Sequence, residues 1–255
     1  DLGGWIEKES NLSDNAWVSD NAQVYGNAKV SGDALVFGNA LITGDAWVYD
    51  NAQVYGNAKV SGDALVYGNA KVYGDAQVYG YAEVSVNAEI YGGAKVSGDA
   101  KIFGNATVSG DARVSGDTRV SGDTRVFGDA QVYGKATVGG DTLVYGKAKV
   151  SGDAMVCGNA RVYGDAEISG NALVYGDTLV RGDAQIMHVS DYMVFKNNWS
   201  SGRYFTWTKS NDMWTVGCFY GTGDELIERA YADSEDSGKH YETYVKFVET
   251  LKNME

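Results

Sequence analysis

Residues 59–78 read KVSGDALVYGNAKVYGDAQV, and the pattern within this stretch decides the fold. An aliphatic residue stands at every sixth position, as at Val60 and Val66, and a small residue follows four positions later, as at Ala64. The same register runs without a slip through residues 12–186. A period of six matches neither a helix nor an isolated alternating strand. It therefore predicts a coil of short strands joined by tight turns.

The residues between the aliphatic and the small position are turn formers. In the hexad Val30-Ser31-Gly32-Asp33-Ala34-Leu35 we expect the Val and Ala side chains to point inward and Gly-Asp to form the turn. Gly permits a positive φ, and Asp or Asn can hydrogen-bond within its own turn. The chain contains no Pro. This is expected if every coil donates N–H groups to its neighbour.

The hexads resemble those of the hexapeptide-repeat left-handed β-helix superfamily, in which three hexads make one triangular coil. The resemblance covers residues 12–186 and implies a mainly β fold, a left-handed parallel β-helix of about ten coils. At a strand spacing of ~4.8 Å this solenoid would be about 45 to 50 Å long. The left hand follows from the resemblance alone, because crossovers between parallel strands are usually right-handed. We expect an N-terminal cap over residues 1–11 and a C-terminal α+β head over residues 187–255.

Residues 18 apart stack in such a coil, and one column is rich in aromatic rings. Its seven aromatic members are Phe37, Tyr55, Tyr73, Tyr91, Phe127, Tyr145 and Tyr163, with Ser109 interrupting them. Stacked rings would contribute ~0.5 to 1.5 kcal/mol per pair beyond area burial. Alternatively, the column is an exposed strip that packs against another subunit. Proteins of the superfamily are commonly trimers, so the resemblance favours a homo-oligomer, with the trimer preferred.

Charge and cysteine content exclude several classes of partner. The net charge of the 255-residue chain is −13, which argues against DNA, RNA or an anionic membrane because phosphate binding needs dense positive charge. No apolar stretch is long enough to span a bilayer. Cys157 and Cys218 form no zinc-ligand cluster and are expected to be free thiols. With no basic and apolar leader visible, we expect a cytoplasmic location.

The repeat lacks the groups that catalysis on this fold requires. Enzymes of the superfamily mostly transfer acyl groups with a His beside a loop that leaves the solenoid. The chain has no His before His188, so a general base is missing from the coils. The superfamily's carbonic anhydrases need three His ligands, and this chain has two histidines in total. Calcium needs a cage of six or more oxygens, which Asp and Asn turns do not build. We therefore expect no catalytic residue, no metal and no cofactor.

The head leaves the six-residue register. Residues 203–220 read as a β-hairpin with a polar turn, and residues 193–196 as a short strand. Two helices follow, one capped by Thr222 or Asp224 and one by Ser237. We expect the head to cover the open C-terminal end of the solenoid, because exposed strand edges invite aggregation and repeat arrays need terminal caps.

Aromatic residues alternate on both faces of this hairpin, so one face would pack the helices and the other would stay available for binding. Trp, Tyr and Arg dominate interface energetics. The candidate ligand- or partner-binding residues are Trp199, Arg203, Tyr204, Trp207, Lys209, Trp214 and His240. The alternative for each of them is a place in a self-contained small core or, for His240, on a solvated helix surface.

The head and the opening Gly3-Gly4-Trp5-Ile6 are similar to uncharacterised hexapeptide-repeat proteins of gut-type bacteria and their phages. The sequence predicts a non-catalytic, rigid binding or scaffold protein that recognises a partner protein or a small nucleotide-like ligand through the head and its subunit interfaces. The resemblance suggests a phage or prophage accessory protein that inhibits host defence. Two alternatives stay open. One is an acyltransferase-like enzyme with His188 or His240 at a subunit interface, and the other is a sponge that sequesters a nucleotide signal there.

Overall fold

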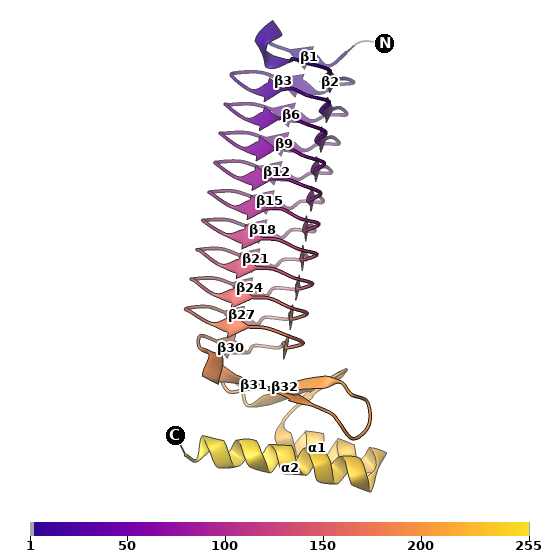
Figure 1. Cartoon of the computed structure of the whole chain (residues 1–255), viewed down its shortest axis with the longest axis vertical. Coiled ribbons are helices and arrows are strands. Elements are labelled where there is room, and N and C mark those ends of the chain that lie inside the picture. The colour runs from indigo at the N-terminus through magenta and orange to yellow at the C-terminus, as the bar shows by residue number, and fades with distance from the viewer. Residues whose placement is uncertain (1–2, 255) are drawn as a thin grey trace.

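A computed structural model describes residues 3–254 and shows a parallel β-solenoid of ten turns, followed by a small antiparallel sheet and two helices (Figure 1). The two helices lie at the end of the molecule opposite the N-terminus (Figure 1). Each turn contributes one two-residue strand to each of three sheets, and the strands within each sheet are parallel. Paired residues are 18 positions apart in the sequence, as in Leu65 and Glu83. The predicted mainly β, three-sided solenoid is confirmed.

Sheet 1 begins closest to the N-terminus. Its strands are β1 (Trp5–Ile6), β3 (Gln23–Val24), β6 (Leu41–Ile42), β9 (Lys59–Val60), β12 (Gln77–Val78), β15 (Lys95–Val96), β18 (Arg113–Val114), β21 (Gln131–Val132), β24 (Lys149–Val150), β27 (Glu167–Ile168) and β30 (Gln185–Ile186).

Sheets 2 and 3 form the other two sides. The strands of sheet 2 are β2 (Trp17–Val18), β5 (Leu35–Val36), β8 (Gln53–Val54), β11 (Lys71–Val72), β14 (Glu89–Ile90), β17 (Thr107–Val108), β20 (Arg125–Val126), β23 (Leu143–Val144), β26 (Arg161–Val162) and β29 (Leu179–Val180). The strands of sheet 3 are β4 (Lys29–Val30), β7 (Trp47–Val48), β10 (Leu65–Val66), β13 (Glu83–Val84), β16 (Lys101–Ile102), β19 (Arg119–Val120), β22 (Thr137–Val138), β25 (Met155–Val156) and β28 (Leu173–Val174).

The core of the solenoid consists of the aliphatic and small columns, whose side chains are buried almost without exception. Four Thr residues replace Ala in the small column and are also fully buried. In Thr124, Thr142 and Thr178 the hydroxyl donates to the backbone carbonyl three residues earlier. Thr118 Oγ1 is buried without a hydrogen-bond partner. In three of the four Thr residues the turn therefore supplies an acceptor for the buried hydroxyl.

The corner turns require a left-handed backbone. Gly44 has φ 71°, and a Cβ on it would lie 2.9 Å from the backbone nitrogen of Gly62 in the next turn. Glycine is thus needed for both its conformational freedom and its small size. Asp50 takes such a position with φ 57°, and its carboxylate accepts the N–H of Gly68 at 3.2 Å. Val86 has φ 63° with no such compensation from its apolar side chain, so the backbone is strained there.

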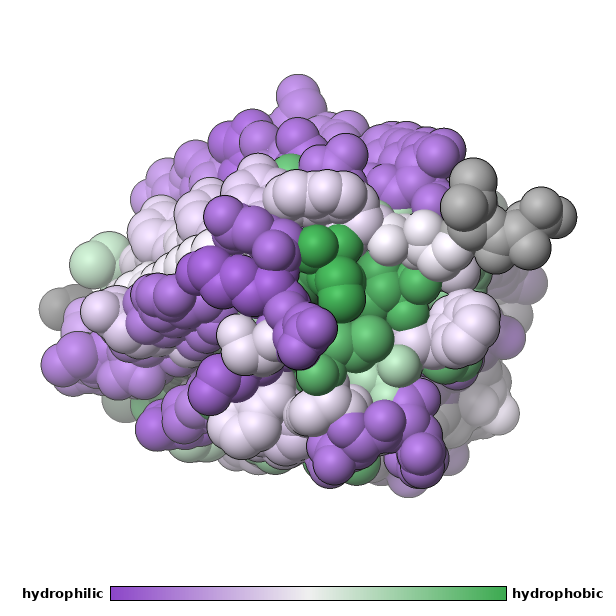
Figure 2. Space-filling view, turned by 90° about the horizontal axis from the view of Figure 1, so that it is seen from above, coloured by the Kyte–Doolittle hydropathy of each residue, from purple (hydrophilic) through white to green (hydrophobic). Residues whose placement is uncertain are grey.

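The solenoid begins one hexad earlier than the sequence predicts. β1 pairs with β3 in the common register, so Ile6 continues the aliphatic column within the predicted cap. Asp1 and Leu2 lie outside the described residues. A short 3-10 turn, η1 (Glu9–Asn11), follows, and the Asn11 side chain donates to the carbonyl of Ala28 at 2.7 Å. Seen from this end, an apolar centre is surrounded by hydrophilic residues (Figure 2).

The head contains a four-stranded antiparallel sheet in chain order and two helices. Its elements are η2 (Val189–Asp191), β31 (Tyr192–Lys196), β32 (Tyr204–Thr208), β33 (Met213–Val216), β34 (Phe219–Gly221), α1 (Gly223–Asp233) and α2 (Glu235–Lys252). The predicted second hairpin strand is in fact two strands, because Gly217 turns the chain with φ 57°. Thr222 caps α1. The prediction that Ser237 caps α2 is wrong, since Ser237 donates its N–H to the true cap, Ser234.

Both faces of the head sheet are covered. Phe205, Trp207 and Trp214 pack with the helices in one apolar cluster, while Thr206 and Thr215, which pair across β32 and β33, are buried on the opposite face. The expectation of one free sheet face is therefore wrong. That face lies on the last turn of the solenoid, where β32 contacts β29.

The head also contacts the open ends of all three sheets. One hydroxyl from the head reaches the last strand of each sheet. The three hydrogen bonds are Tyr192 Oη to Leu173 O (2.9 Å), Leu179 N to Thr206 Oγ1 (3.0 Å) and Gln185 N to Ser210 Oγ (2.7 Å). A strand edge left open exposes unpaired backbone groups. The head therefore covers the C-terminal end of the solenoid, as a terminal cap does in repeat proteins.

Candidate functional site

Two of the predicted binding residues belong to the core of the head. Trp207 and Trp214 are each 2% exposed, and they pair across β32 and β33. Trp207 also donates its indole N–H to Asp212 at 2.8 Å. Their proposed role on a binding surface is corrected, because alternation in the sequence does not reveal which sheet face the helices cover.

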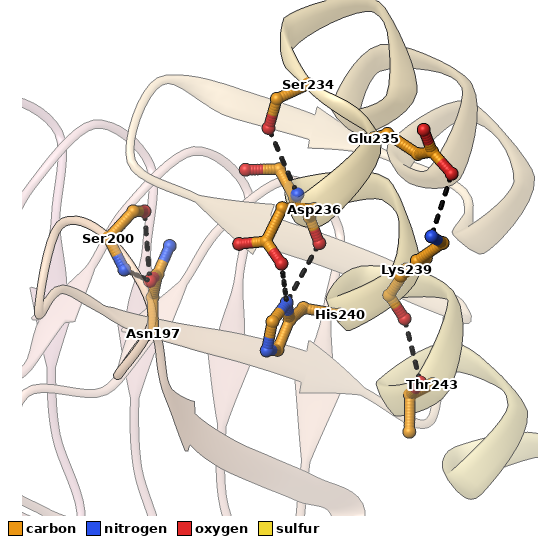
Figure 3. A network of polar contacts seen from close by, with 9 residues as sticks. Asn197, Ser200, Ser234, Glu235, Asp236, Lys239, His240 and Thr243 are labelled. Carbon is orange, nitrogen blue, oxygen red and sulfur yellow. Dashed lines mark hydrogen bonds and ion pairs between the residues drawn. The ribbon is translucent and has the colours of Figure 1, made fainter.

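The side chains of Trp199 and His240 are in direct contact. Their rings stack with centroids 4.4 Å apart and planes 8° apart. His240 Nδ1 lies 2.8 Å from the backbone oxygen of Asp236, one helical turn earlier (Figure 3). In the loop that carries Trp199, the Asn197 side chain accepts hydrogen bonds from Ser200 (Figure 3). One face of the Trp199 ring is therefore covered by His240, and the pair fixes this loop against α2.

The remaining predicted residues lie at the surface. Arg203 and Tyr204 are exposed, at the start of β32. Lys196 Nζ lies 5.3 Å from the centre of the Tyr204 ring. Lys209 is in the turn after β32, where its backbone N–H donates to Asp191. Of the seven predicted residues, the structure brings only Arg203 and Tyr204 together around a hollow surface.

That hollow, which we name the junction cleft, has a volume of about 470 Å³ and lies between the solenoid and the head. Arg161, Tyr163 and Leu179 line it from the last turns of the solenoid. Arg203 and Tyr204 line it from the head. Because both parts of the molecule contribute, the cleft exists only when the head is docked on the solenoid.

The junction cleft offers positive charge to a ligand. Neither Arg161 nor Arg203 has a side-chain hydrogen bond or ion pair within residues 3–254. Burial and the neighbouring Tyr163 raise the pKa of Tyr145 at the cleft wall, while Arg161 acts in the opposite direction. Guanidinium groups recognise carboxylates and phosphates through paired hydrogen bonds. Asp177 is the one acidic residue of the lining, and its carboxylate accepts a hydrogen bond from Asn159 at 3.0 Å.

The aromatic column leads towards this cleft as two stacks of rings. Phe37, Tyr55, Tyr73 and Tyr91 form the first stack, and Phe127, Tyr145 and Tyr163 form the second, with neighbouring centroids 4.8–4.9 Å apart. All seven residues are half-buried. The predicted stacking is confirmed, whereas the predicted subunit interface stays a prediction.

A second hollow adjoins the junction cleft. This pocket, which we name the turn pocket, has a volume of about 270 Å³ and lies between the Gly217–Cys218 turn and α1. Arg203 and Cys218 line both hollows. Arg229 from α1 stands on the rim of the turn pocket, and its guanidinium also lacks a partner in the described part of the chain. Arg161, Arg203 and Arg229 thus surround one turn of the head.

The family description "YdcK Beta solenoid repeat" matches five segments of the chain, residues 22–36, 52–68, 100–116, 106–122 and 166–182. In these segments the chain is similar to the YdcK beta solenoid repeat. Two of the matches overlap with an offset of six residues, which is the length of one hexad. The last match ends at residue 182, before the head begins. No curated protein matches the chain.

Sequence reasoning missed Arg161, Arg229 and Cys218 as members of the site. Arg161 occupies an outward position of the hexads that carries Trp, Leu, Gln, Lys, Glu, Thr or Arg in other turns, so its type alone gave no signal. Arg181 was the available clue, because it takes the place of an aromatic ring in the stacked column nearest the head. Its position marked the end of the column and the start of the junction.

Nothing in residues 3–254 gathers three or more His, Cys, Asp or Glu side chains in a geometry that could hold a metal ion. The two histidines lie at the cap of η2 and on α2, in the head. None of the described residues lining the junction cleft is a histidine. None of the helices in residues 3–254 is long and apolar enough to cross a membrane.

Proposed function

We propose that this protein is a non-catalytic, rigid binding protein whose junction cleft accepts an acidic segment of a partner protein. The pair of unpartnered guanidiniums, Arg161 and Arg203, carries the proposal. Both guanidiniums line one hollow, although the chain as a whole has a net charge of −13. Acidic side chains of a partner would supply the missing hydrogen-bond acceptors, with a stronger charge-assisted bond at each guanidinium.

The shape of the molecule supports a scaffold role. The solenoid has backbone hydrogen bonds between every pair of neighbouring turns. The junction cleft has one wall from the solenoid and one from the head. The three hydrogen bonds between hydroxyl groups of the head and the last strands of the sheets hold these walls in place. A preformed cleft loses little conformational entropy on binding, so a modest number of contacts suffices for affinity.

A small nucleotide-like ligand is a second candidate. The cleft volume of about 470 Å³ lies within the range of about 300–1,000 Å³ that is typical of small-molecule sites. Tyr145, Tyr163 and Tyr204 would contact a base, and the two arginines would contact phosphate. In the phage setting suggested by the sequence resemblance, the partner would be a host defence protein, or the ligand its nucleotide signal. The acyltransferase alternative would need a histidine brought to the cleft by another subunit.

Fluorescence anisotropy tests the proposal with three dye-labelled peptides of equal length. The acidic peptide is rich in Asp and Glu, the neutral peptide in Asn and Gln, and the basic peptide in Lys. We expect the acidic peptide alone to bind, and Arg161→Gln and Arg203→Gln each to weaken its binding about tenfold, as expected for loss of a charged hydrogen bond of ~1.5 kcal/mol. Arg125→Gln is the matched control, because Arg125 lies on the same face of sheet 2 outside the cleft. Equal binding of the acidic and neutral peptides would refute the proposal. Binding of ATP in preference to every peptide would favour the nucleotide candidate.

We also propose that the protein is a homo-oligomer in which the aromatic column lies at the subunit interface, with a trimer expected from the sequence resemblance. The half-buried rings leave their edges available for such a contact. Native mass spectrometry of the wild type and of Tyr55→Ser tests this part separately. A trimer that weakens in the variant supports the interface, and a monomeric wild type contradicts it.

A further inference from the structure

The turn pocket differs from the junction cleft in its floor. Leu226 and Ala230 of α1 and Tyr241 of α2 line it, and they are only 3%, 3% and 7% exposed. The pocket therefore reaches down to the apolar core of the head. Its volume of about 270 Å³ falls below the usual range of about 300–1,000 Å³ for sites that take a whole small molecule. An apolar side chain is an occupant of the right size and character.

The rim of the turn pocket is charged. Arg203 and Arg229 lie on it without ion pairs among the described residues, and Asp233 lies on it as the one acidic group. Arg229 and Asp233 are four residues apart on α1, yet they form no ion pair within 4.0 Å. The pocket thus combines an apolar floor with two guanidiniums that have no acceptor. Its ligand should carry an apolar group and an anionic group close together.

A single residue at the C-terminus of a polypeptide has this combination, because its side chain and its carboxylate share one Cα atom. An internal apolar residue followed by an acidic one fits less well. In an extended chain successive side chains point to opposite faces, so the acidic side chain would point away from the rim. Two guanidiniums also match the two oxygens of one carboxylate.

We propose that the turn pocket binds the C-terminal residue of a partner polypeptide, with its apolar side chain on the pocket floor and its carboxylate between Arg203 and Arg229. This inference rests on the proposed function, because the acidic residues that precede this C-terminus would lie in the adjoining junction cleft. Arg203 connects the two sites. A Cβ built on Gly217 would lie 3.6 Å from Arg203 Nη1, so this guanidinium lies over the turn that separates them.

Anisotropy measurements on the full chain test the inference with three dye-labelled acidic peptides: one ending in Leu with a free carboxylate, the same peptide with a C-terminal amide, and one ending in Ser. We expect the amide and the Ser peptide each to bind about tenfold more weakly than the Leu acid. Arg229→Gln should weaken binding of the Leu acid by a similar factor. It should have almost no effect on the amide, because both changes remove the same interaction. Asp233→Asn should strengthen binding of the Leu acid, since it removes a like charge from the rim.

Arg161→Gln separates this inference from the proposed function. It lies outside the turn pocket, so it should weaken the acid and amide peptides equally. Equal affinity for the acid and the amide, or an equal effect of Arg229→Gln on both, would overturn the inference while an Arg161→Gln effect still supported the proposed function. Failure of every acidic peptide to bind would overturn both.

Discussion

The guanidinium carbon of Arg181, in the last turn of the solenoid, lies 4.7 Å from the centre of the Tyr220 ring in the head. The same guanidinium lies 5.2 Å from the Tyr163 ring, the last ring of the aromatic column. Arg181 thus continues the column into the head. Tyr220 also approaches the backbone closely, because a methyl group on Gly182 would overlap its hydroxyl.

Replacing Arg181 by Met should loosen the head. The substitution keeps an apolar stem but removes a cation from between two rings, at a cost of about 1–2 kcal/mol. Hydrogen–deuterium exchange of β34 should accelerate, and the thermal midpoint should fall. Arg125→Met is the control, since Arg125 makes no ring contact in the described part of the chain. Identical exchange in both variants would show that the Arg181 contact does not hold the head.

Replacing Val86 by Gly should stabilise the solenoid. Val86 has φ 63°, a conformation that costs a β-branched residue ~1–3 kcal/mol, so we expect a gain of about 1 kcal/mol after the larger entropy of Gly in the unfolded chain. The opposite change one turn earlier, Gly68→Ala, should destabilise, because its Cβ would lie 3.0 Å from the nitrogen of Val86. Guanidinium denaturation measures both. A denaturation midpoint for Val86→Gly below that of the wild type would contradict the backbone strain at Val86.

Thr118 and Thr124 form a matched pair in neighbouring hexads. Thr124 Oγ1 donates to the carbonyl of Ser121 at 2.7 Å, whereas Thr118 Oγ1 is buried and unpaired. A buried unsatisfied hydroxyl costs ~1–3 kcal/mol, and a satisfied hydrogen bond contributes ~1 kcal/mol. Thr118→Val should therefore raise the midpoint of chemical denaturation, and Thr124→Val should lower it. Equal shifts of the denaturation midpoint in both variants would show that the two hydroxyls do not differ in hydrogen bonding.

Tyr73 should ionise late in an alkaline titration. Burial raises its pKa from 10.0 to about 12, and Glu89, which accepts a hydrogen bond from its hydroxyl, adds to the shift. Since the neutral phenol is favoured in the folded state, this contribution to stability is present below pH 10 and is lost as the pH rises through about 12. Absorbance titration of the wild type and of Tyr73→Phe measures the effect. Loss of an early-titrating component in the variant would contradict the assignment.

The solenoid could be predicted from the sequence because nearly every hexad repeats the same pattern, with an inward Val or Ile, an inward Ala and a Gly turn. The site could not, because it depends on how two different units meet. Trp207 and Trp214 lie on the sheet face that packs against α1 and α2, and the alternation in the sequence does not show which face the helices cover. Arg161 and Arg203 are distant in sequence and converge only because the opposite face docks on the solenoid.

Hydrogen–deuterium exchange on the full chain, with and without the acidic peptide that ends in Leu, tests the central claim most directly because it locates the bound segment. The account predicts slower exchange at residues 203–205 and 216–219, which border the junction cleft and the turn pocket, and unchanged exchange in the first turns of the solenoid. Protection confined to the solenoid face around Arg125, or to the N-terminal end, would contradict it.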